Sequence, residues 1–461
     1  MNVKKYSKTY NFMFILLCAF YTGFLWRLRG DHGWGSFKGM TAVALGLLLA
    51  IISFMPYRKK INTEIFPFVI LLTALTNSGW GTLNSQITGF LGSGTDAPAV
   101  FISPVSGAAV MFLLGFGWAP FLAMFIGYYL SDKKPKYYHY LIVIAVYFAV
   151  EYITKASISH LAVKLVSPTA EAAFADTLKS QGFDLTPYKA YLAHFDNISW
   201  AKKLDFGRNY FQTVETCSQT FATLASIIYV RFAAKDKTAA KIQTLVCASF
   251  GIAITAADLF IFLADGGFRN SLANVPQWLT GWSNWEYWTG FIAGLLIAVI
   301  IVVYVKKHPG KENLRPECIL PDKKPIVFIR NYLAVAFPVI MAAAVPLSIR
   351  LTYVNDFFFR NVSFSDDEIL CIPFAAAAGI LMIFPAVKMM KKELLGEKEL
   401  IIKAAPVMLT ASFGVFSLLY FCTGNAYLLN GSKTDISITM YISAAIIALL
   451  LFLLNKIKTK A

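Results

Sequence analysis

Long runs of apolar residues alternate with short polar connections along the whole chain. Most runs have about 17 to 25 residues, the length that an α-helix needs to cross a bilayer. The runs fall near 10–26, 40–56, 65–84, 103–130, 138–160, 214–233, 243–264, 286–305, 326–347, 368–387, 401–422 and 437–455. This pattern predicts an all-α, polytopic integral membrane protein with about twelve transmembrane helices.

Two of the predicted helices differ from a simple span. The run at 103–130 is long enough to bend, and Gly115, Gly117 and Pro120 mark where we expect the bend. The first run follows a basic N-terminus, as it would in a secretory signal peptide. Because no small-residue cleavage site follows and Trp26-Arg27 is a poor candidate, we expect an uncleaved first helix.

Composition agrees with this architecture and narrows the expected partners. The chain is 57% hydrophobic and 15% charged, with a mean hydropathy of +0.58, which excludes an ordinary soluble globular protein. A net charge of +16 would suggest nucleic-acid binding in a soluble protein, but here basic residues at helix ends mark topology. We therefore expect membrane lipids, and no nucleic acid, as partners. The six cysteines include no C-x-x-C pair and predict neither a metal site nor a disulfide framework.

Lysine and arginine gather in alternate connections, and this orients the chain. The basic connections are 4–8, 58–60, 133–136, 231–241, 306–324, 388–403 and 456–460. Because short loops rich in these residues stay in the cytoplasm, we expect both termini there, in a bacterial-type plasma (inner) membrane. We expect one transmembrane domain over 1–461, with a long extracytoplasmic loop at 160–213 that carries short surface helices.

Two Gly-Trp-Gly turns, centred on Trp34 and Trp80, follow the first and third runs. They suggest a hairpin repeat that relates 10–56 to 65–130. One interpretation is that each turn is only an aromatic anchor at the membrane interface. The other is a shared binding site in which Trp34, Trp80, Asn84 and Gln86 contact a substrate.

The densest group of charges in an expected outer loop is Arg27, Arg29, Asp31 and His32. In one interpretation the arginines extend to the lipid headgroups and Asp31 pairs with one of them. In the other, Arg27 and Arg29 bind a phosphate while Asp31 or His32 performs acid–base catalysis.

Ionisable residues inside apolar runs indicate function, because a charge in the bilayer core is costly. Glu151 and Lys155 are one helical turn apart and can form a local ion pair, while Glu215 begins the sixth run. Asp258 has no partner near it in the sequence, so it needs one on another helix. Glu151 and Asp258 are therefore candidate catalytic residues.

The connection that follows the seventh run is rich in tryptophan. A membrane-interface belt explains this, but stacking on a sugar ring or an isoprenoid is the alternative. Asp265, Arg269 and Trp282 in this connection are candidate substrate-binding residues.

Familiar nucleotide, metal and hydrolase motifs do not occur: no Walker motif, no GxGxxG after a strand, no HExxH and no GxSxG. We expect no cofactor and no metal.

Two function classes fit the sequence. The first is a transferase that acts at the outer face on a phosphate-bearing lipid or a lipid-linked glycan, and the second is a secondary transporter for a small polar or anionic solute. Whether the chain is an enzyme stays open.

Overall fold

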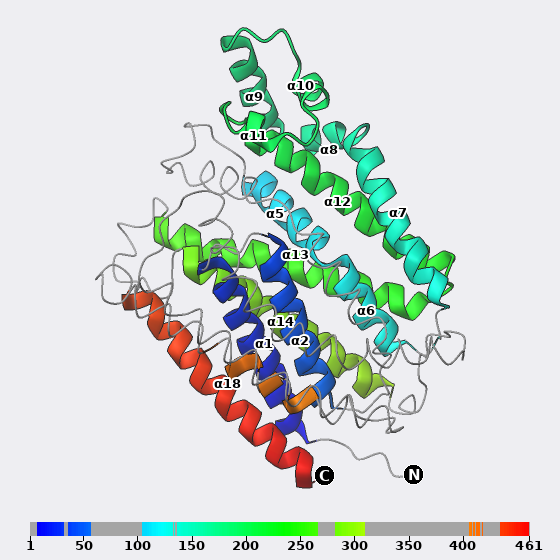
Figure 1. Ribbon diagram of the computed structural model, residues 1–461, viewed down its shortest axis with the longest axis vertical. Helices are drawn as coiled ribbons and strands as arrows, with labels where there is room; N and C mark the ends of the chain where they lie inside the picture. Colours follow the sequence, from blue (N-terminus) through cyan, green and yellow to red (C-terminus); the bar gives the residue numbers. More distant parts are fainter. Residues whose placement is uncertain are drawn as a thin grey trace, which may run out of the picture. The chain divides into compact units, whose positions relative to one another are not determined.

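The computed structural model of the chain describes residues 7–31, 36–56, 104–131, 133, 136–265, 282–308, part of 405–417, and 434–460. Every longer element in these ranges is an α-helix (Figure 1). The helices are α1 (Lys8–Asp31), α2 (Ser36–Phe54), α5 (Pro104–Trp118), α6 (Pro120–Leu130), α7 (Tyr137–Lys155), α8 (Ser159–Val166), α9 (Pro168–Ser180), α10 (Pro187–Ala193), α11 (Ile198–Ala201), α12 (Gly207–Phe232), α13 (Lys237–Asp265), α14 (Trp282–Lys307) and α18 (Thr434–Lys460).

Four of the described helices, α1, α13, α14 and α18, contain a stretch long and apolar enough to cross a membrane. Two bent pairs, α5 with α6 and α7 with α8, raise this to as many as six spans in the described part of the chain. The fold is thus helical and suited to a membrane. The count of twelve stays a prediction, because the runs at 65–84, 326–347 and 368–387 lie outside the described residues.

Helix α12 covers the predicted sixth span, 214–233, but it is not among these membrane-span candidates. The reason is its polarity, since Thr, Ser and Gln side chains fill much of its buried surface. This polar interior becomes important for the site.

Packing divides the chain into two compact units. Unit 1 comprises Met1–Leu75, Tyr128–Tyr137 and Glu286–Ala461, and unit 2 comprises Thr76–Gly127 and Tyr138–Trp285. Of the described helices, α1, α2, α18 and most of α14 belong to unit 1, whereas α5, α7 to α13 and most of α6 belong to unit 2.

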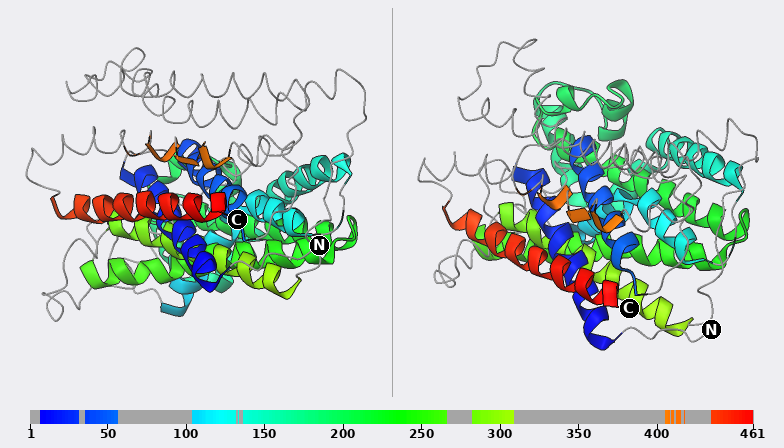
Figure 2. Two further views of the ribbon diagram at one scale, coloured as in Figure 1. Left: turned by 90° about the horizontal axis from the view of Figure 1, so that it is seen from below. Right: turned by 60° about the horizontal axis from the view of Figure 1, so that its bottom comes forward.

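Within unit 1, α1 meets α14 through glycines. A β-carbon added at Gly290 would lie 2.4 Å from the carbonyl oxygen of Thr22, and one at Gly294 would lie 2.4 Å from that of Cys18. Gly23 of α1 approaches the backbone of Tyr287 in the same way. Small residues of this kind let helix backbones come close together in membranes. Helix α18 also contacts α1 (Figure 2).

Within unit 2, α5 packs on α13, and α12 packs on both. The chain bends by 60° between α5 and α6. Pro120 explains this bend, because proline has no N–H to continue the hydrogen bonds of α5. The bend expected in the run at 103–130 is therefore present, at the last of its three candidate positions.

The segment between α7 and α12, where the sequence predicts short helices, contains α8 to α11. We call residues 156–206 the cap. The cap has an apolar core that includes Phe174, Leu178 and Tyr191 and continues into the N-terminal part of α12. Thr186 begins α10 by accepting a hydrogen bond from the Lys189 N–H, as helix N-caps do. The position of the cap outside the membrane stays a prediction.

Candidate functional site

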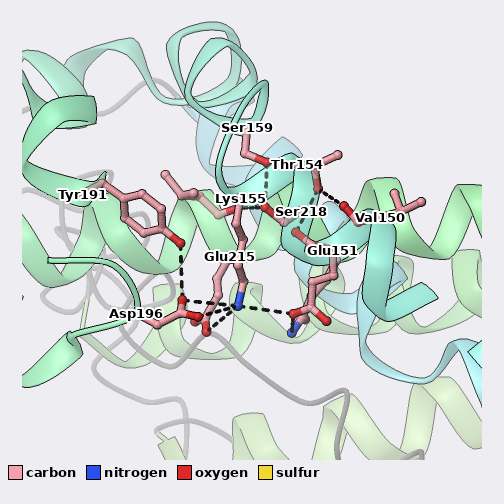
Figure 3. Close-up of polar contacts among 11 residues, drawn as sticks. Val150, Glu151, Thr154, Lys155, Ser159, Tyr191, Asp196, Glu215 and Ser218 are labelled. Carbon is pink, nitrogen blue, oxygen red and sulfur yellow. Dashed lines mark hydrogen bonds and ion pairs between the residues drawn. The ribbon is translucent and has the colours of Figure 1, made fainter. Parts of the chain in front are cut away.

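Four charged side chains of unit 2 converge where α7 ends (Figure 3). The ammonium nitrogen of Lys155 lies 3.4 Å from Glu151 Oε1, 3.3 Å from Asp196 Oδ1 and 3.7 Å from Glu215 Oε1. We call these four residues the Lys155 cluster. The lysine is thus surrounded by carboxylates from three different parts of the chain.

Each member of the Lys155 cluster has a local reason for its position. Glu151 and Lys155 are four residues apart on α7, which brings their side chains to one face of the helix. Glu215 projects from α12. Asp196 lies in the turn between α10 and α11 with a φ of 55°, a left-handed conformation that aspartate tolerates better than most residues. The turn therefore directs its carboxylate toward α7.

Neighbouring polar groups hold the carboxylates in place. Gln219, one turn after Glu215 on α12, donates a hydrogen bond of 3.4 Å to Glu151 Oε1. The Tyr191 hydroxyl donates to Asp196 Oδ1 at 3.3 Å. Burial, and then the negative charge of Asp196, raise the pKa of Tyr191 well above its ordinary value. The tyrosine therefore remains protonated and able to donate.

The charges of the Lys155 cluster do not balance. One ammonium faces three carboxylates, so the fully ionised cluster has an excess of two negative charges. The exposed fractions of the side chains are 10% for Lys155, 14% for Glu151, 21% for Glu215 and 46% for Asp196. The excess charge is thus largely removed from water at Glu151 and Glu215, where repulsion between like charges is strongest.

Comparison with known protein families, curated proteins and solved structures finds no match to this chain. The chemistry of the Lys155 cluster is therefore the main guide to function. Among the described residues, no group of three or more His, Cys, Asp or Glu side chains is arranged to hold a metal ion. The carboxylates of the cluster surround the lysine nitrogen instead.

Of the residues that the sequence singles out, Glu151, Lys155 and Glu215 meet in this cluster. The local ion pair between Glu151 and Lys155 is present, but it is only one part of a larger arrangement. Sequence reasoning missed Asp196, which lies outside every apolar run. One signal for it existed: a lysine inside an apolar helix needs acidic partners, and one glutamate a turn away leaves its other hydrogens unsatisfied.

Arg27 is the member of the expected outer-loop group of charges whose side chain the structure describes. Its side chain is 0% exposed. Protein therefore surrounds its side chain, and its relation to the lipid headgroups stays a prediction. Tyr287 of α14 lies within electrostatic reach of it.

The other candidate residues lie outside the described part of the chain, wholly or in their side chains. One group lies outside entirely: His32, Trp34, Trp80, Asn84, Gln86 and Arg269. The second group belongs to described helices, but its side chains are not described: Arg29 and Asp31 in α1, Asp258 and Asp265 in α13, and Trp282 in α14. Their convergence on one cavity stays a prediction. So does the transferase interpretation, because it depends on these residues.

Proposed function

We propose that the chain is a secondary membrane transporter for a small polar solute, and that protons couple to transport at the Lys155 cluster. The observation that carries this proposal is the presence of three carboxylates around one largely buried lysine. Ionisable groups within membrane bundles commonly belong to ion pathways and proton relays.

The charge imbalance gives the Lys155 cluster a reason to bind protons. Each proton taken up by a carboxylate removes one of the two excess negative charges, and two protons leave the cluster neutral. Glu151 and Glu215 are the favoured acceptors, since their side chains are less exposed than that of Asp196. A proton at either residue also weakens its attraction to Lys155, so protonation changes how the helices are held together.

The bends in two helix pairs of unit 2 also support transport. The chain bends by 60° between α5 and α6 and by 70° between α7 and α8. Interrupted helices near ion or substrate sites are a recurring feature of secondary transporters, because they free backbone groups and allow one part of a helix to move. The Lys155 cluster lies at the second of these bends.

Orientation is the second part of the proposal. We place both termini in the cytoplasm of a bacterial-type inner membrane, and the cap on the outer side. The test uses single cysteines in place of the exposed residues Asp184 in the cap and Lys235 after α12. An impermeant thiol reagent added to intact cells should label the cysteine at 184 and not the one at 235. Labelling at 235 alone would reverse the orientation.

Coupling is tested with purified protein in liposomes that contain a pH-sensitive dye, using a panel of small polar and anionic solutes. At least one solute should drive proton entry. Glu215→Gln and Glu151→Gln should reduce that entry at least tenfold, because glutamine cannot accept the proton. Asp184→Asn is the matched control, since it removes an exposed carboxylate of the cap, and it should leave the rate unchanged.

The same liposomes distinguish the transferase interpretation. Lipid-linked sugars and phosphate-bearing lipids are included outside, and the lipid fraction is examined for covalent products. A new covalent product without solute-driven proton entry would contradict the transporter proposal.

A further inference from the structure

A row of buried polar residues follows one face of α12 inward from the Lys155 cluster. Glu215, Gln219, Thr223 and Ser226 are separated by four, four and three residues, which places them on the same side of a helix. Gln219 is 5% exposed, and Thr223 and Ser226 are fully buried. At 1.5 Å per residue the row is about 16 Å long, roughly half of a bilayer's hydrocarbon core.

Helix α7 contributes a matching row. Tyr147, Glu151 and Lys155 are each four residues apart, so they too share one face. Tyr147 is fully buried, lies beside Thr223 and is within reach of the charge of Glu151. The two rows are linked directly where Gln219 donates to Glu151.

The inner end of the row reaches the bend between α5 and α6 through Gln243 of α13. Gln243 is fully buried, and its Nε2 lies 3.0 Å from Ser226 Oγ and 3.3 Å from the carbonyl oxygen of Pro120. A carbonyl oxygen only accepts hydrogen bonds, so the amide nitrogen must face Pro120. This fixes the orientation of the amide and leaves its oxygen, Oε1, on the other side.

Several buried oxygens of unit 2 have no hydrogen-bond partner among the described residues, including Gln243 Oε1 at the inner end of the row and the hydroxyl oxygen of Thr216 on α12. An unsatisfied buried acceptor destabilises a fold, and such groups are normally satisfied by ordered water. At Gln243 the row thus requires a donor that the described residues do not supply.

We propose that ordered water molecules occupy the row and form a proton route from the Lys155 cluster to the bend between α5 and α6. This inference rests on the proposed proton coupling and extends it with a path. A proton enters a water molecule from a carboxyl group of Glu151 or Glu215. Each following water or hydroxyl accepts one proton and releases another, so that only the entry and exit groups change charge. Gln219 and Gln243 do not release protons, so water must bridge past them.

The first test asks whether water is present, and it does not depend on transport. Hydroxyl radicals generated in bound water by a brief X-ray pulse oxidise the side chains that touch that water, and mass spectrometry locates the oxidised residues. Tyr147 should be oxidised although it is buried. Phe14 of α1 is equally buried in an apolar region and should not be. An unlabelled Tyr147 would overturn the inference.

The second test asks whether the water carries protons. Gln243→Leu and Thr223→Val should slow solute-driven proton entry into liposomes at least tenfold, while Thr223→Ser, which keeps the hydroxyl, should retain the rate. Ser249→Ala is the control, because Ser249 is a buried serine of α13 whose hydroxyl donates to the Leu245 carbonyl oxygen of its own helix.

The outcomes separate the two proposals. Loss of proton entry in Glu215→Gln but not in Gln243→Leu or Thr223→Val would overturn the route and leave the coupling site intact. Normal rates in all of these variants would overturn both. If Thr223→Val fails to fold, Gln243→Leu and the radical labelling of Tyr147 still decide whether the route exists.

Discussion

Two contacts between helices, one in each unit, differ in the residues that form them: glycines in unit 1, and charged and amide side chains in unit 2. In unit 1, α1 and α14 meet where Gly23, Gly290 and Gly294 bring backbone against backbone. In unit 2, α7 and α12 are linked by Lys155 and the acidic and amide side chains around it. Close packing of small residues supplies stability without charge. Buried charges are an expensive way to join helices, so their presence between α7 and α12 indicates a task other than stability.

The largest effect should follow from removal of the lysine. Lys155→Met leaves three carboxylates without their shared cation. Loss of one partner from a buried ion pair typically destabilises a protein by about 3–5 kcal/mol. We expect a loss of stability in this range at pH 7, measured by thermal or denaturant unfolding in detergent.

A second substitution checks that charge is the cause. Lys155→Met combined with Glu215→Gln restores the original excess of two negative charges and should recover part of the loss. The gap between Lys155→Met and the wild type should also narrow as the pH falls toward about 4, where carboxylates become protonated. An undiminished gap in both cases would mean that lost packing, and not charge, destabilises the variant.

The glycine contact of unit 1 should be the next most sensitive. Gly294→Ala places a methyl group 2.4 Å from the carbonyl oxygen of Cys18, so the helices must separate. Overpacking of this kind costs about 1–3 kcal/mol. Gly414→Ala is the control, because a β-carbon there meets nothing within 4 Å and alanine favours a helix. The two variants should shift the unfolding midpoint in opposite directions or by clearly different amounts.

How much of this was predictable depends on sequence separation. Apolar periodicity located α1, α13, α14 and α18, and Pro120 located a bend, because these features depend on neighbouring residues. The pair Glu151–Lys155 was predictable for the same reason, since helical geometry relates residues four apart.

The rest of the Lys155 cluster depends on tertiary structure. Asp196 reaches Lys155 across 41 residues, through a turn that no periodic pattern announces. The sequence shows Glu215 at the start of an apolar run, but its contact with Lys155 depends on how α12 packs in unit 2. The sequence pattern gives 214–233 as an apolar run, whereas the polar face of α12 becomes apparent only in the structure, where Gln219 of α12 and Gln243 of α13 are buried.

A smaller effect is expected at Asp196, because its side chain is the most exposed in the Lys155 cluster. Asp196→Asn removes the charge while keeping a residue that tolerates a φ of 55°. A partly exposed ion pair contributes about 0.2–1 kcal/mol, so the loss should be within that range. Asp196→Ala should destabilise more, since alanine also disfavours the left-handed conformation. Equal effects of the two variants would contradict this account of the turn.

The smallest effect is expected at an ion pair of the cap that water reaches. Glu171 lies 3.8 Å from Lys164, whose side chain is 59% exposed. Burial raises the pKa of Glu171 above its ordinary value, and Lys164 and His160 only partly oppose this. The folded protein therefore binds a proton at this site more readily than the unfolded chain does, so stability falls as the pH rises through the raised pKa. Glu171→Gln removes that penalty and should stabilise the protein at pH 7 by less than about 1 kcal/mol.

Below about pH 4 the wild-type carboxyl is already neutral, and the two proteins should unfold alike. A variant that is less stable than the wild type at pH 7 would show that the pair with Lys164 outweighs the burial, and that even a water-exposed pair in this chain stabilises the fold.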